Sequence, residues 1–298
     1  MTEQLAPAAE QQRAPERPTP AVYDPPDIPG KGPTDWMGGW KWGLYAPLIL
    51  LGLAIAIRVY QAFAVFPWGL DSSTTQFFWM WRMLVVAFLL GVGIFTVVWW
   101  RWILQTAKSL PQRISRREEV RRIAVFWGLV GATSVNLYIE ASFWPNQDGA
   151  FHQTLVRDTA FTVSHIPMFY LFFPLGVTLA VGTYLYGRTR IPAVYGPDKG
   201  FPWSFFLLIS ATVTEVAQVA MNEWGHSVNL GNAGAEEFFA VWFHWPFVLY
   251  GWLASGIFAL WGETILRLYA IEDEEAADAR DSVPAPAPST SAPVPRRS

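Results

Sequence analysis

The sequence predicts an all-α, polytopic membrane protein with about six transmembrane helices. Its 298 residues are 52% hydrophobic and only 15% charged, with 17 Trp and 21 Phe, which is unlike a soluble domain. Six stretches are apolar over the roughly 20 helical residues that cross the hydrocarbon core of a bilayer. The positive residues between these stretches gather in alternate connections, which is the charge pattern of a protein that crosses a membrane repeatedly.

The expected spans lie one after another within a transmembrane domain over residues 36–270. They cover about 44–66, 77–100, 124–144, 166–187, 202–221 and 238–266. The connections 101–123 and 188–200 carry seven and three Lys or Arg residues, and the other three connections carry only Arg157. The two basic connections are therefore expected in the cytoplasm. Both termini follow them there, and the protein is expected in the cytoplasmic (inner) membrane, surrounded by lipid.

The two ends of the chain are too polar to bury a core. Residues 1–35 are rich in proline, and residues 271–298 are first acidic and then rich in proline. Both compositions are typical of disordered tails. Just before the first span, Trp36, Trp40 and Trp42 lie where a belt of aromatic residues at the membrane boundary is expected.

All four histidines of the chain fall into two sets of matching pattern. The first set is Asp148, His152 and His165, and the second is Asn222, His226 and His244. Within each set the first two residues are four apart, so on a helix they share a face and can bind one ion. The predicted topology brings both sets to the extracytoplasmic side. With no cysteine in the chain, imidazole with carboxylate or amide oxygen predicts two metal sites.

Each of these residues also has a purely structural interpretation. A single histidine near a membrane boundary is more often a hydrogen-bonded packing residue than a ligand. Asp148 could be a solvated loop residue, and Asn222 could cap a helix. The occurrence of two matched sets on one side of the membrane favours metal binding. Two imidazoles and one carboxylate leave coordination positions open for oxygen or substrate, and copper, iron and zinc all suit such ligands.

Other polar side chains lie deep in the expected spans. They are Arg58, Arg82, Glu140, Glu215, Gln218 and Glu263. Charges inside hydrocarbon are costly and usually paired. Glu140 and Glu215 lie on spans that lead to the two sets, where they could support the ligands or carry protons. Arg58 and Arg82 could instead tie helices together or meet another subunit.

The residues around the two sets resemble a known family, the C subunits of the copper membrane monooxygenases. This family includes those of particulate methane monooxygenase, ammonia monooxygenase and the short-chain hydrocarbon monooxygenases. The resemblance is carried by YIEASFWPNQDGAFHQTLVRDTAFTVSHI, MNEWGHS and EEFFAVWFHWPFVLYGW, with WGLDS and SRREEVRR in support. It extends from about residue 40 to residue 268.

The resemblance implies copper as the cofactor and a role for each set. Asp148, His152 and His165 correspond to the copper ligands regarded as the site of oxygen activation, which makes them the expected catalytic residues. Asn222, His226 and His244 correspond to a second copper site. The resemblance also implies assembly with A and B subunits into a trimer of heterotrimers. The reaction would insert one atom of O2 into a small apolar substrate, with quinol as the electron donor, and nucleic acid is not an expected partner.

The sequence departs from the family pattern at three places. The segment SVNLGNAGA after His226 is longer than expected for methane oxidisers, and Ala160 and Val163 stand where the family more often has Asp and Pro. None of these changes touches an expected ligand. Together with the long tails, they favour a methane or short-chain hydrocarbon substrate over ammonia.

Two other functions stay open at this point. His152 and His165 are 13 residues apart and could be the axial ligands of a haem in an electron-transfer subunit, although the residues between them are polar and typical of a loop. The histidines could also simply pack, in which case the chain is a non-catalytic scaffold and another subunit performs the chemistry.

Overall fold

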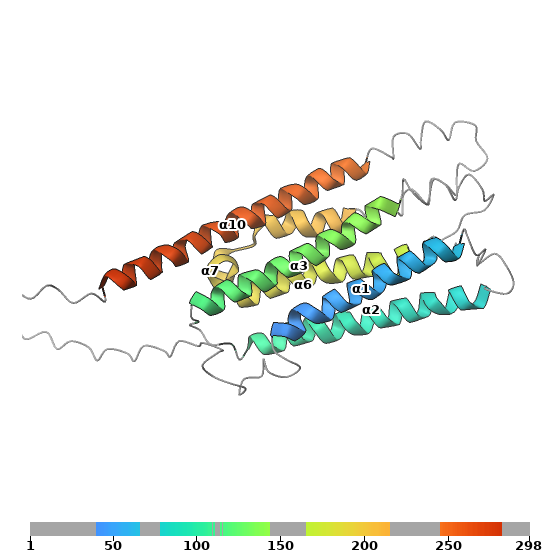
Figure 1. Ribbon diagram of the computed structural model, residues 1–298, viewed down its shortest axis with the longest axis horizontal. Helices are drawn as coiled ribbons and strands as arrows, with labels where there is room; N and C mark the ends of the chain where they lie inside the picture. Colours follow the sequence, from blue (N-terminus) through green and yellow to red (C-terminus); the bar gives the residue numbers. More distant parts are fainter. Residues whose placement is uncertain are drawn as a thin grey trace, which may run out of the picture.

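The computed structural model is a bundle of long helices that lie side by side (Figure 1). It describes residues 40–65, 78–108, 116–143, 165–214 and 245–281, together with the single residues 110 and 114. The long elements are α1 (Trp40–Val65), α2 (Phe78–Ala107), α3 (Arg116–Phe143), α6 (Phe173–Arg190) and α10 (Trp245–Asp281). The shorter ones are α5 (His165–Pro167), η3 (Met168–Phe172), α7 (Pro192–Tyr195), η4 (Pro197–Lys199) and the helix Trp203–Thr214. The all-α prediction is confirmed for this part of the chain.

Four helices in the described part are long and apolar enough to cross a membrane. They are Trp40–Tyr60, Trp79–Ala107, Arg116–Glu140 and Met168–Arg190, and they match the first four expected spans. The helix Trp203–Thr214 is shorter and begins inside the fifth expected span. α10 begins inside the sixth. The remainder of the fifth span, and the sixth before Trp245, lie outside the described residues.

The alternating directions of the helices define two ends of the bundle (Figure 1). At the first, α3 ends at Phe143, α5 begins at His165 and α10 begins at Trp245; we call this the histidine end. At the second, α3 begins at Arg116 and α6 ends at Arg190; we call this the arginine end. The segments expected on opposite sides of the membrane are therefore attached to opposite ends of the bundle.

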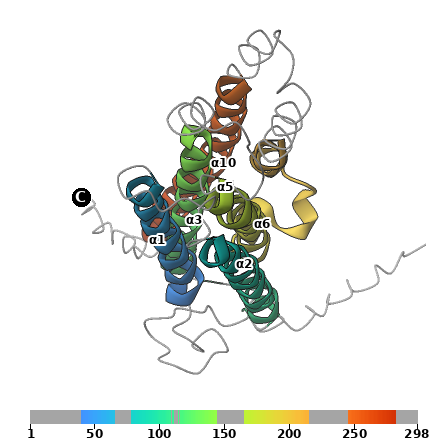
Figure 2. The same cartoon turned by 90° about the vertical axis from the view of Figure 1, so that its right-hand side faces the viewer.

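The continuous helix formed by α5, η3 and α6 occupies the middle of the bundle (Figure 2). α2 and α3 pack on α6, while α1 and α10 pack on α3. Because lipid is as apolar as a protein core, such helices associate through close packing and interhelical hydrogen bonds more than through burial of apolar area. Gly182 illustrates the close packing: a Cβ atom there would lie 2.0 Å from the Trp99 ring.

Two helix boundaries differ from those expected. Both ends of the connection expected at 101–123 are helical, since α2 continues to Ala107 and α3 begins at Arg116. Residues 271–281, expected to begin a disordered tail, are also helical because α10 continues to Asp281. The added turns are rich in strong helix formers such as Arg, Glu and Ala.

Candidate metal centre

The described helix ends that flank the predicted ligands lie together at the histidine end. α3 ends at Phe143, shortly before Asp148, and His165 is the first residue of α5. α10 begins at Trp245, directly after His244. Figure 2 faces this end and shows α5 near the centre of the bundle. The chain therefore enters and leaves the first ligand segment, and leaves the second, at one end of the fold.

Most of the predicted ligands themselves lie outside the described residues. These are Asp148, His152, Asn222, His226 and His244, and of His165 only the backbone is described. Glu215 and Gln218 also lie outside. Within the described part, no group of three or more His, Asp or Glu side chains could hold a metal ion. The two predicted ligand sets therefore stay predictions, and their carboxylate, amide and imidazole groups are donors that suit copper.

A buried polar pair lies close to the histidine end of α3. Asn136 and Glu140 are only 0% and 1% exposed. The Asn136 amide Nδ2 donates hydrogen bonds to Glu140 Oε1 and, across to the neighbouring helix, to the Phe172 carbonyl oxygen at 3.1 Å. The burial of Glu140 agrees with its predicted position deep in a span. Its partner Asn136 joins α3 to the helical segment that begins at His165, through the hydrogen bond to Phe172.

That segment contains a π-helical turn that the sequence did not predict. In η3 the N–H of Phe173 bonds to the carbonyl oxygen of Met168, five residues earlier. Pro174 follows directly and has no N–H, so it cannot donate the bond that an α-helix would require there. The carbonyl of Phe172, the last residue of this turn, accepts the hydrogen bond from Asn136. Turns of this kind are rare and are often found at functional sites.

The other polar residues that were expected deep in the spans do not belong to the Asn136–Glu140 pair. Arg58 on α1 and Arg82 on α2 are partly buried. Glu263 on α10 lies towards the arginine end, where the Ser204 hydroxyl donates a hydrogen bond of 2.7 Å to its carboxylate. Burial and the nearby Glu263 carboxylate raise the pKa of Tyr195, which keeps this phenol neutral. Glu263 thus fastens α10 to the helix Trp203–Thr214 and is remote from the histidine end.

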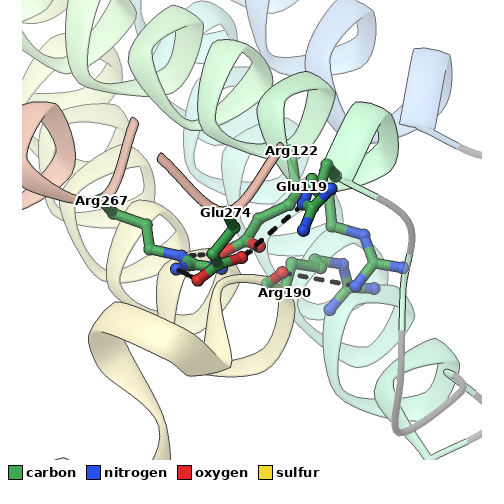
Figure 3. A network of polar contacts seen from close by, with 6 residues as sticks. Glu119, Arg122, Arg190, Arg267 and Glu274 are labelled. Atoms are coloured by element: carbon green, nitrogen blue, oxygen red, sulfur yellow. Dashed lines mark hydrogen bonds and ion pairs between the residues drawn. The ribbon is translucent and has the colours of Figure 1, made fainter. Parts of the chain in front are cut away.

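The arginine end is held by a network of ion pairs and hydrogen bonds (Figure 3). Arg267 on α10 bonds to both carboxylate oxygens of Glu119 on α3 and to Glu274 about two turns further along its own helix. Arg122 bonds to Glu118 at 2.8 Å, in the i,i+4 spacing of a helix face. The sequence motif SRREEVRR contains most of these groups. Acidic and basic residues in this motif are spaced three or four apart, and this spacing was the sequence signal that a helix begins at Arg116.

Arg190 is the most deeply buried cation of this network, with 4% of its surface exposed. Its guanidinium donates to the Ile103 carbonyl at 2.8 Å and to the Thr106 hydroxyl. It also lies over the rings of Trp102 and Tyr186, 5.2 and 5.3 Å from their centroids. Sequence reasoning placed Arg190 in a cytoplasmic connection and missed this role. The guanidinium in fact joins the end of α6 to the end of α2.

These observations define a class of protein, a bundle of membrane-length helices with the predicted metal ligands next in sequence to one end and with arginine pairs fastening the other end. Within that class, the chain belongs to the family of the C subunits of ammonia monooxygenase/methane monooxygenase, whose family model matches residues 30–275. No protein with a curated description matches the sequence. The resemblance seen in the sequence is thereby confirmed.

Family membership establishes several properties of the chain. It is a membrane subunit of the ammonia/methane monooxygenase enzyme complex and works together with the partner subunits of that complex. The family is one of copper monooxygenases. This favours the copper interpretation of the histidine sets over the haem interpretation.

Proposed function

We propose that this chain provides the copper site at which the complex oxidises a small apolar substrate. Asp148, His152 and His165 form the catalytic set, and Asn222, His226 and His244 form a second copper site. The observation that carries the proposal is the position of Phe143, His165 and Trp245 at one end of the bundle. Since these residues are next to the ligand segments in sequence, their position supports a site for both sets at this end of the bundle.

In this proposal the chain's residues bind and shield the metal. The Asp148 carboxylate supplies negative charge, and the His152 and His165 imidazoles supply neutral nitrogen donors. Copper bound there would supply the chemistry that activates O2. Ile166 and Met168 follow His165 and are fully buried, so the helix below the ligands is closed to water. Exclusion of water protects a strong oxidant from side reactions.

The full topology is part of the same proposal. Six spans, with both termini in the cytoplasm, put the arginine end in the cytoplasm and the histidine end on the outer side of the membrane. The basic residues at the arginine end support this orientation. An apolar substrate dissolved in lipid can then reach the histidine end from the bilayer, while quinol supplies electrons and the A and B subunits complete the trimer of heterotrimers.

We assign a short-chain hydrocarbon or methane, with ammonia as the less favoured substrate. Ala160, Val163 and the long segment after His226 support this choice, because they alter the surroundings of the two sets without changing a ligand. The purified complex is expected to oxidise methane or a short-chain alkane or alkene faster than ammonia. Faster oxidation of ammonia would overturn the substrate assignment and leave the copper assignment standing.

The catalytic assignment is tested with Asp148→Ala in the assembled complex. Turnover is expected to be abolished while the three subunits still purify together. Asp198→Ala is the matched control, because Asp198 is an exposed carboxylate at the arginine end. Full activity of the Asp148→Ala complex would contradict the proposal and favour the scaffold interpretation.

A further inference from the structure

The contact between Asn136 and the π-helical turn connects α3 to the backbone that carries His165. His165 precedes Phe172 by seven residues in one continuous helical stretch, a separation of about 10 Å along the axis. Asn136 donates to the Phe172 carbonyl from α3, the helix that also leads to Asp148. The two helices next to the ends of the first ligand set are therefore joined at this point by a buried hydrogen bond.

Gly176 shows how closely the two helices meet at this point. A Cβ atom at Gly176 would lie 2.8 Å from Glu140 Oε1 and 2.9 Å from Asn136 Nδ2. Both distances are too short for real contacts, so any larger residue at this position has to displace the polar pair. The glycine lets α6 approach the two side chains directly.

The same helices have a second polar contact that does not involve the π-helical turn. The Thr133 and Thr183 hydroxyls lie 3.4 Å apart, about one turn closer to the arginine end. If the only role of such contacts were to hold α3 against α6, a contact like this one would be sufficient. The Asn136 contact differs because it binds a backbone carbonyl within the π-helical turn itself, on the helical stretch that begins at His165.

We infer that Asn136 and Glu140 are positioning residues that fix the rotation of the π-helical turn and thereby place His165 for metal binding. Asn136 donates a hydrogen bond to the Phe172 carbonyl, and Glu140 orients the Asn136 amide by accepting a hydrogen bond from its other N–H. Residues that hold ligands in place typically change metal affinity 10- to 100-fold when they are replaced. This inference rests on the proposed copper site, because it assigns the support of that site.

The test measures copper affinity and the copper electron paramagnetic resonance spectrum of the copper-depleted, reloaded complex. Asn136→Leu removes both hydrogen bonds, and Gly176→Ala displaces the pair from the other helix without removing a polar group. Each is expected to weaken copper binding at the first set at least about tenfold and to change the hyperfine splitting of its signal. Glu140→Gln keeps an acceptor for Asn136 and is expected to behave as the unmodified protein, whereas Glu140→Ala is not.

Two control variants separate positioning from general damage. Thr183→Val breaks the neighbouring contact between α3 and α6. Gly187→Ala creates a comparably tight contact in α6, 2.9 Å from Phe205, at the arginine end. Both are expected to leave the copper signal unchanged. Equal copper losses in the controls and in Gly176→Ala would overturn the inference, and so would a loss in Glu140→Gln as large as that in Glu140→Ala.

Asp148→Ala, measured in parallel, separates the two proposals. A copper deficit in Asp148→Ala, with unmodified spectra in both Asn136→Leu and Gly176→Ala, would overturn the positioning role alone. No deficit in Asp148→Ala would overturn the copper site and the positioning role with it.

Discussion

Arg267 on α10 and Glu119 on α3 are joined by two parallel hydrogen bonds, from Nε to Oε1 at 2.7 Å and from Nη2 to Oε2 at 2.8 Å. Their side chains are 20% and 8% exposed, so water competes only weakly for them. Two-pronged pairs of guanidinium and carboxylate combine strength with a fixed geometry. This pair therefore fixes α10 against α3 at the arginine end.

Glu119→Gln is expected to lower the free energy of unfolding by about 2 kcal/mol, because a charge-assisted pair is lost and the Arg267 cation is left half-buried. The measurement is denaturant unfolding of the complex in lipid nanodiscs. Asp198→Asn is the matched control, since its pair with Lys199 is exposed and 3.6 Å long; pairs of this kind contribute about 0–1 kcal/mol. Equal effects of the two changes would contradict the role given to Glu119.

The same network predicts a pH dependence at acid pH. The hydrogen bond from Arg267 lowers the pKa of Glu274 below its usual value, which is about 4.3 in an unfolded chain. The stabilisation is therefore complete above that pH and is lost as the pH falls through the lower, folded-state pKa. Because Glu274 is largely exposed, the effect should stay below about 1 kcal/mol. Below about pH 4, stability should fall less steeply in Glu274→Gln than in the unmodified protein, and equal slopes would contradict this prediction.

The packing of α2 on α6 is tested at Gly182. A Cβ atom at this position would lie 2.0 and 2.4 Å from two atoms of the Trp99 ring, which is itself fully buried. Gly182→Ala should therefore destabilise the protein by roughly 1–3 kcal/mol or more. Gly91→Ala, on α2 with nothing within 4 Å, should have little effect. The melting temperatures of the two variants check the prediction, and similar values would mean that α2 and α6 are packed differently.

The orientation in the membrane can be tested cleanly because the chain contains no cysteine. Lys199 in η4 is exposed at the arginine end, so Lys199→Cys supplies a single accessible thiol on this polypeptide. A membrane-impermeant maleimide should label this thiol in inside-out vesicles and leave it unlabelled in right-side-out vesicles. The reverse pattern would invert the topology and place the histidine end in the cytoplasm.

The sequence predicted the existence of the helices better than their ends. An apolar run of about 20 residues is enough to specify a membrane helix, and the first four expected spans each correspond to one. The ends depend on flanking polar residues whose environment the sequence does not show. α3 begins at Arg116 and not near 124, because Glu118 and Arg122 stabilise its first turns from within the helix.

Two features were out of reach because they depend on residues distant in sequence. Arg190 belongs to a basic connection by composition, yet it is buried because its acceptor, the Ile103 carbonyl, lies on another helix 87 residues away. The π-helical turn was marked in sequence only by Pro167 and Pro174, and its contact with Asn136 arises only when α3 packs on it. The ligand sets were predicted from residue type, spacing, expected topology and the family resemblance, and apart from the His165 backbone they lie outside the described residues.

The most direct test of the proposed copper sites is the copper content of the purified complex in native-like lipid, measured per chain together with iron and haem. Asp148→Ala and Asn222→Ala are compared with the unmodified protein, so that copper held by partner subunits cancels. We expect each variant to lose copper, and we expect neither loss to affect assembly. Unchanged copper in both variants would contradict the proposed copper sites and would place the catalytic metal elsewhere in the complex.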